Sequence, residues 1–249
     1  AQPMKTLYFV NTVEEVEDHS TSPPTVTSHD RPSFGTKPYA PKYQAKYDAM
    51  TRVVSLEQDV GWNEAKLQTI LRRSGIFEGF PIPDAVLVRA EFKPGGIDQR
   101  IDLLFLTSDG ELVACELKIR GDYPDSHGQL LRYVADLSFD QWDLNRVRAA
   151  HALYLGTIKD DLVSRLTDDR FGAFGEEHRI NKSGPLPVRA GGVIMDVAFK
   201  APTRAAVRYL NRLHGLRIDL IQICARVPKD WSATGTDRWM RLDFETIDP

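Results

Sequence analysis

The sequence predicts an α/β protein built on one central mixed β-sheet flanked by helices. Its 249 residues are 42% hydrophobic and 27% charged, which is ordinary for a globular domain and excludes a wholly disordered chain. Apolar runs of strand length alternate with segments whose apolar residues recur every three to four positions. The order of the clearest segments, a helix, three strands, a helix and a strand, is typical of a sheet covered by helices.

The first 60 residues differ in character from residues 61–249, where we expect the main domain. Residues 5–11 have the pattern of a strand. Residues 19–33 are polar and contain several prolines, with no period of 2 or 3.6, which predicts a loop or an arm. Such an arm suits contact with a second copy of the chain or with a regulatory partner.

The helices and strands of the main domain follow from hydrophobic spacing. Residues 62–73 place Leu67, Ile70 and Leu71 on one helical face, and Ser74-Gly75 predicts the end of that helix. Three strands and a second helix follow, at residues 86–92, 101–107, 111–119 and 126–137. For the C-terminal half we expect a strand, two helices and two closing strands, at residues 150–156, 159–166, 203–213, 216–227 and 238–244.

The composition favours a soluble cytoplasmic protein without a membrane partner. No run approaches the roughly 18 apolar residues of a membrane helix, and the first apolar stretch is too short for the core of a signal peptide. Cys115 and Cys224 lie inside apolar runs, without partners at metal-binding spacing. They are expected to be buried thiols in a reducing compartment.

The charge is unevenly distributed along the chain. A net charge of −3 argues against a protein that coats nucleic acid by bulk electrostatics, yet residues 179–226 hold nine basic and two acidic residues. Arg204, Arg208 and Arg212 recur every four residues on a predicted helix and would form one basic ridge able to contact phosphates. The alternative is a solvated helix surface.

Cleavage of a phosphodiester bond with Mg²⁺ or Mn²⁺ needs oxygen ligands for the metal and a cation near the phosphate. A Glu-x-Lys tripeptide supplies both kinds of group, and it occurs three times, at residues 64–66, 91–93 and 116–118. In the first copy the two side chains point roughly 200° apart on a helix. In the second copy the nearest acid, Asp84, shares a strand with Glu91 and lies roughly 23 Å away.

The third copy meets the geometric requirement. The three-residue turn Ser108-Asp109-Gly110 sets a hairpin register that places Asp102 opposite Glu116, and Lys118 projects from the same face. A charged face on an otherwise apolar hairpin is costly unless something uses it. An internal salt bridge on an exposed sheet face is the alternative interpretation. The other face carries an apolar stripe of Val113, Cys115, Leu117 and Ile119.

The helix after this hairpin carries two more candidate residues. Gln129 and Tyr133 are four positions apart and therefore share one helical face. Taken singly, Gln129 would be an exposed helix former and Tyr133 a half-buried aromatic. Their position directly after the carboxylate hairpin favours a shared role.

These residues resemble the motifs of the PD-(D/E)XK phosphodiesterase superfamily, in the RecB-like branch that adds a Gln-x-x-x-Tyr motif. The matching strings are Arg100-Ile101-Asp102, Glu116-Leu117-Lys118 and Gln129 to Tyr133. The chain is particularly similar to mismatch-type DNA endonucleases and to the nuclease domains of phage-defence proteins. The resemblance implies a restriction-endonuclease-like fold over residues 61–249 and a nuclease acting on DNA, with RNA still open, in genome maintenance or anti-phage defence.

The resemblance also implies roles for single residues. Asp102 and Glu116 would bind Mg²⁺ or Mn²⁺, with the Leu117 carbonyl and Glu64 as further ligands. Lys118 would position or activate water and stabilise the charge of the transition state. On the following helix, Gln129 would help to orient the lysine or the substrate, and Tyr133 would contact the nucleic acid.

Two departures from the family pattern limit this reading. Ile101 stands where the family name has proline, and only about 60 residues precede the catalytic helix, so mismatch specificity does not transfer. A noncatalytic nucleic-acid-binding or assembly module that retains the fold is the alternative from a different functional class. A nuclease restrained until a partner binds is a third possibility.

Overall fold

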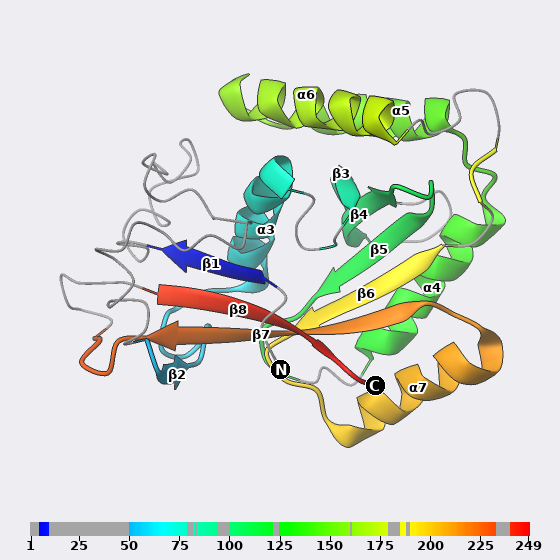
Figure 1. Ribbon diagram of the computed structural model, residues 1–249. Helices are drawn as coiled ribbons and strands as arrows, with labels where there is room; N and C mark the ends of the chain where they lie inside the picture. Colours follow the sequence, from blue (N-terminus) through cyan, green and yellow to red (C-terminus); the bar gives the residue numbers. More distant parts are fainter. Residues whose placement is uncertain are drawn as a thin grey trace.

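The computed structural model describes residues 5–9, 50–78, 82, 84–93, 100–121, 125–159, 161–178, 185–187, 190–232 and 240–249. They form an α/β arrangement of one mixed sheet flanked by helices (Figure 1), which confirms the expected class. The strands are β1 (Lys5–Phe9), β2 (Arg52–Val54), β3 (Ala85–Phe92), β4 (Ile101–Thr107), β5 (Leu112–Leu117), β6 (Gly191–Asp196), β7 (Ile218–Val227) and β8 (Met240–Ile247).

Five helices accompany these strands in the described part of the chain. No helix there is long and apolar enough to cross a membrane. The helices are α3 (Glu64–Glu78), α4 (Ser126–Phe139), α5 (Leu144–Leu155), α6 (Asp161–Glu177) and α7 (Ala201–His214).

The sheet is parallel at its centre and antiparallel on either side. Its strand order is β1-β8-β7-β6-β5-β4-β3, and β2 pairs with β7 off this path. Strands β5, β6 and β7 run parallel, whereas β3, β4 and β5 form an antiparallel meander. Strands β1 and β2, from the first 60 residues, pair with β8 and β7 of this same sheet.

The hairpin of β4 and β5 has the predicted turn and register. Gly110 has a φ of 80°, a left-handed conformation that glycine adopts without steric cost. The backbone N–H of Thr107 donates to the carbonyl of Glu111 over 2.9 Å, which closes the turn. Leu103 lies opposite Cys115, so the same register brings Asp102 across from Glu116.

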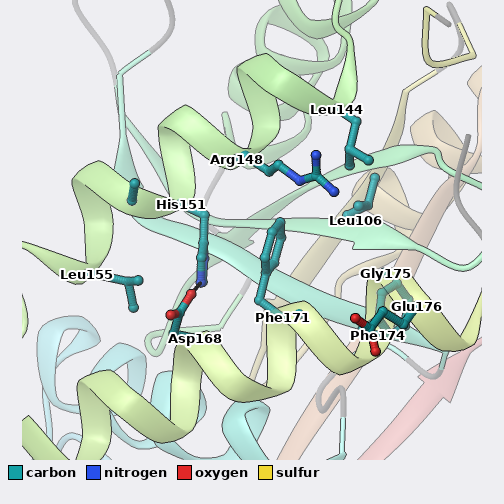
Figure 2. A pocket seen from close by; sticks show the side chains of 12 residues that line it. Leu106, Leu144, Arg148, His151, Leu155, Asp168, Phe171, Phe174, Gly175 and Glu176 are labelled. Atoms are coloured by element: carbon teal, nitrogen blue, oxygen red, sulfur yellow. Dashed lines mark ion pairs between the residues drawn. The ribbon is translucent and has the colours of Figure 1, made fainter. Parts of the chain in front are cut away.

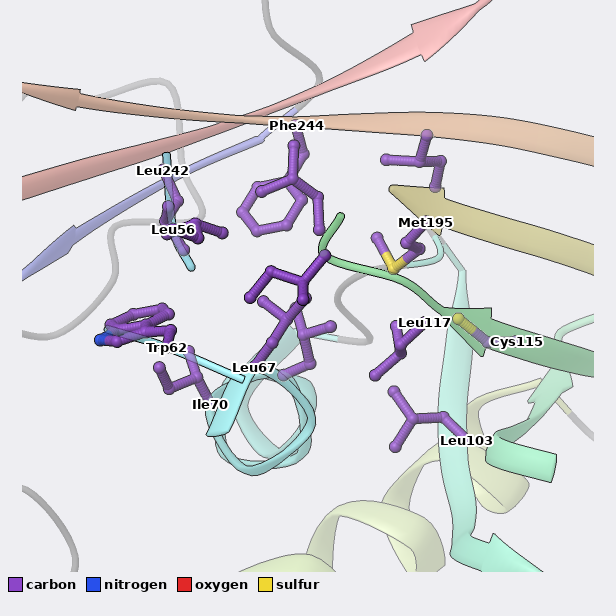
Figure 3. Close-up of a cluster of buried hydrophobic side chains, with 14 of the residues drawn as sticks. Leu56, Trp62, Leu67, Ile70, Leu103, Cys115, Leu117, Met195, Leu242 and Phe244 are labelled. Carbon is purple, nitrogen blue, oxygen red and sulfur yellow. The ribbon is translucent and has the colours of Figure 1, made fainter. Parts of the chain in front are cut away.

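One side of the sheet packs against α3 (Figure 3). Leu67 and Leu71 of α3 are fully buried in a cluster with Trp62 and with side chains of β4, β5 and β6. The predicted apolar stripe of β5 faces this cluster, since Val113, Cys115, Leu117 and Ile119 all belong to it. This burial holds the alternate residues of β5 toward the opposite face.

The opposite side of the sheet packs against α4, α5 and α7. Leu130, Tyr133 and Val134 of α4 join one buried cluster with Leu104 of β4 and Ile194 of β6. Helix α4 lies close to the sheet because β6 has glycine at position 192. A Cβ there would stand 2.7 Å from Cδ2 of Leu130.

Two predicted elements need correction. Residues 150–156, expected to be a strand, belong to helix α5, whose buried residues Leu144, Val147, His151 and Tyr154 recur every three or four positions from a start upstream of the predicted segment. Helix α3 continues through Ser74-Gly75 to Glu78, since a glycine within a helix costs only about 1 kcal/mol.

Other boundaries also differ from the expectation. Helix α6 extends to Glu177, well past the predicted end at residue 166, and strands β2 and β6 were not predicted. Strand β5 is shorter than residues 111–119. The expected arm at residues 19–33 lies outside the described residues.

The close contact at Gly192 gives a test of the packing of α4. We expect Gly192→Ala to lower the free energy of unfolding by about 1–3 kcal/mol, because its methyl group overpacks the core against Leu130. Gly191→Ala is the matched control, since its Cβ would meet no atom closer than 3.5 Å. Chemical denaturation of both variants measures the difference, and equal stabilities would contradict the packing described.

Candidate active site

Strands β4 and β5 bring together the three charged residues predicted from the hairpin. Asp102 lies near the start of β4, and its Oδ2 accepts a hydrogen bond of 2.7 Å from the backbone N–H of Leu117. Lys118 follows β5 directly, and its Nζ donates to Oε1 of Glu116. The backbone N–H of Lys118 also donates to the carbonyl of Met195, which ties the end of β5 to β6.

Glu116 and Lys118 form a buried ion pair. The two residues are 1% and 8% exposed. Removing two charges from water costs several kcal/mol for each ion, which their attraction offsets only when the remaining polar atoms are also satisfied. Oε2 of Glu116 is buried without a hydrogen-bond partner among the described residues. The carboxylate therefore retains an acceptor for a further ligand.

The carboxyl groups of Asp102 and Glu116 lie close together in a site that is largely buried. Burial raises the pKa of Asp102 to about 6. Burial and the charge of Asp102 raise the pKa of Glu116 to about 8. Burial lowers the pKa of Lys118, but the neighbouring Glu116 carboxylate outweighs it and leaves that pKa raised. A cation bound beside the carboxyl groups would relieve their repulsion.

Helix α3 contributes polar side chains from one face. Oε2 of Glu64 lies 4.0 Å from Nζ of Lys118, so the expected additional acid is close to the ion pair. Gln68, one helical turn later, donates from Nε2 to Oε1 of Glu91 over 2.7 Å and to the carbonyl of Asp102 over 3.1 Å. The site therefore includes Gln68 and Glu91, which the sequence analysis did not assign to it.

Glu91 joins the site through an unusual backbone conformation. Its φ of 52° places Glu91 in the left-handed region. For a residue other than glycine this conformation costs about 1–3 kcal/mol. Its carboxylate pairs with Arg100 over 2.8 Å. As expected, Glu91 and Asp84 lie at opposite ends of β3. The spacing of Glu64 and Gln68, four positions apart, could have placed both side chains on one face of α3. Nothing in the sequence pattern indicates the positive φ of Glu91.

Gln129 and Tyr133 of α4 support the start of β4. Nε2 of Gln129 donates to the hydroxyl of Tyr133 over 2.7 Å, and that hydroxyl donates to the carbonyl of Arg100 over 2.6 Å. Tyr133 is fully buried, and burial raises its pKa to about 12. In this arrangement the pair positions the backbone beside Asp102, and the tyrosine ring has no exposed surface for a nucleic acid.

The arginines of the predicted basic ridge lie on α7. Arg204 donates to the carbonyl of Asp248, from Nη2 over 2.7 Å and from Nε over 3.2 Å. Nε of Arg208 donates to the carbonyl of Pro249 over 2.5 Å. Arg212 is exposed. Two of the three guanidinium groups thus hold residues 248 and 249 against the helix.

The donors at the hairpin suit a hard divalent cation. Mg²⁺ commonly takes one or two carboxylates and completes its shell with water and phosphate oxygens. Asp102 and Glu116 are such a pair, and Oε2 of Glu116 is unpartnered within the described chain. No group of three or more His, Cys, Asp or Glu side chains in those residues is arranged to hold a metal on its own. The shell would thus depend on other oxygen ligands.

Comparisons with known proteins identify no relative of this chain. No protein-family model matches the chain, and no curated protein and no solved structure matches it either.

The ion pair gives a test that needs no ligand. In the presence of EDTA at pH 9, where both carboxyl groups are ionised, Asp102→Asn is expected to keep or slightly raise the free energy of unfolding, because it removes repulsion from Glu116 and retains an oxygen for Leu117 N–H. Lys118→Met is expected to lower it by about 3 kcal/mol, since it leaves Glu116 buried without its cation.

Urea unfolding of the two variants beside the wild type measures these effects. Equal losses of stability would instead make Asp102 part of the structural salt bridge.

Proposed function

We propose that this chain is a nuclease that hydrolyses DNA phosphodiester bonds with the help of Mg²⁺ or Mn²⁺. One observation carries the proposal. Two acidic side chains lie across a hairpin beside a lysine, and the buried Glu116 has an oxygen without a partner in the described chain. A purely structural salt bridge has no need of the second acid or of the unsatisfied oxygen.

Each charged residue has a distinct task in this proposal. Asp102 and Glu116 hold the cation, and the contact between Asp102 and Leu117 N–H fixes the first carboxylate. A bound divalent cation supplies Lewis acidity toward the scissile phosphate. Lys118 stabilises the negative charge that develops on the phosphate oxygens, and burial strengthens that interaction.

The remaining residues position these groups. Glu64 lies within reach of the lysine ammonium and is the candidate for a further ligand. Gln129 and Tyr133 hold the carbonyl of Arg100, two residues before Asp102. The choice of DNA over RNA rests on the motif resemblance, and the exposed Arg212 is the member of the α7 ridge best able to meet a phosphate.

A noncatalytic nucleic-acid-binding or assembly module is the second candidate, and one observation favours it. The ammonium group of Lys118 already donates to Glu116, as a structural salt bridge requires. In that case the hairpin charges would stabilise the fold and no bond would be cleaved.

Cleavage assays separate the two candidates. We expect the wild type to cut at least one of circular duplex DNA, linear duplex DNA, single-stranded DNA and RNA with Mn²⁺, and to cut none with EDTA. Asp102→Asn and Lys118→Ala should reduce the rate by about 100-fold or more, the scale of losing one electrostatic contact to a transition state. Cleavage of RNA alone would replace DNA as the substrate.

The matched control is Asp109→Asn, an exposed aspartate in the turn of the same hairpin. It should cleave at the rate of the wild type. Circular dichroism establishes that each variant is folded. Folded proteins that all fail to cut every substrate, or that cut equally well with EDTA, would contradict the metal-dependent nuclease.

A further inference from the structure

A second polar site, lined by none of Asp102, Glu116 and Lys118, lies in a pocket between α5 and α6 (Figure 2). Both helices pack against β3, and the pocket has a volume of about 280 Å³. Small-molecule sites commonly measure about 300–1,000 Å³, so this pocket suits a small ligand. Most of its walls are apolar side chains: Leu106, Leu144, Leu155, Phe171 and Phe174.

The pocket contains a buried imidazole with one nitrogen unused. His151 is 2% exposed, and its Nδ1 lies 2.9 Å from the carbonyl of Val88. A carbonyl oxygen only accepts, so Nδ1 carries the hydrogen and Nε2 of the neutral ring is an acceptor. Nε2 has no hydrogen-bond partner among the described residues. Phe171 stacks on the ring at 4.0 Å between centroids and fixes its orientation.

A carboxylate faces this unused nitrogen. Oδ1 of Asp168 lies 4.0 Å from Nε2 of His151, and burial lowers the pKa of the imidazole, which keeps it neutral. Two acceptors at this separation can both accept from one nitrogen donor that lies about 2.9 Å from each. The charged groups lining the pocket are Arg148, Asp168 and Glu176, one cation and two anions, so the pocket favours a positively charged ligand.

Two glycines keep the pocket open. Gly172 and Gly175 line it from α6, and a Cβ added at either would meet no atom within 4 Å. Glycine is unfavourable in the interior of a helix, and neither position needs it for close packing or for a left-handed backbone. The missing side chains leave space that a ligand can fill.

We propose that the pocket between α5 and α6 binds a small molecule with a protonated primary amine on an apolar body. The ammonium group donates to Nε2 of His151 and to the carboxylate of Asp168. The apolar body lies against Phe171 and Phe174, in the space left by Gly172.

Phenethylamine is the probe for this site, and 2-phenylethanol is its uncharged counterpart. Titrations of the full chain followed by NMR, in a buffer free of primary amines, measure both affinities. We expect phenethylamine to bind at least tenfold more tightly than the alcohol. Asp168→Asn should weaken the binding of the amine at least fivefold, and Gly172→Leu should abolish it by filling the pocket.

Two neighbouring variants control for indirect effects. Asp169→Asn repeats the Asp-to-Asn change and Ala173→Leu adds a leucine side chain, both at exposed positions on α6 that do not line the pocket. Both should bind phenethylamine within twofold of the wild type. The proposal is overturned if the wild type binds neither probe, which would leave water as the bridge, or if it binds only added Zn²⁺. Equal effects of the pocket variants and their controls would also overturn it.

Discussion

Burying Glu116 against Lys118 within a largely apolar sheet is the constraint on which the candidate active site depends. The ion pair is possible because the rest of β5 is apolar and its alternate side chains are fixed in the core against α3. That packing holds Glu116 on the opposite face, and the turn at Gly110 sets Asp102 across from it. The carboxylates thus repel each other in a position that the hydrophobic core and the turn determine.

Elements from both sides of the sheet meet at the start of β4. Helix α3 binds the carbonyl of Asp102 through Gln68, and helix α4 binds the carbonyl of Arg100 through Tyr133. Strand β3 adds Glu91, which bonds to both Gln68 and Arg100. These contacts fix the backbone on either side of Ile101, so Asp102 is positioned by three elements distant from one another in sequence.

Local signals explain which parts of this structure could be predicted. The β4–β5 register followed from one turn, and α7 followed from regular spacing, because both depend on neighbouring residues. Residues 150–156, at the C-terminal end of α5, were mistaken for a strand because the helical spacing shows only when Leu144 and Val147 are included. Gln68 and Glu91 depend on contacts between distant segments, and Glu91 also on a positive φ, which the sequence pattern did not indicate.

The most direct measurement of the role of Glu116 is a titration with Mn²⁺, followed by the electron paramagnetic resonance signal of the free ion. We expect the wild type to bind Mn²⁺ with a Kd below about 1 mM. Glu116→Gln should weaken that binding at least tenfold, which corresponds to about 1.4 kcal/mol. Equal affinities in the two proteins, or no binding to the wild type, would contradict a metal site at this hairpin.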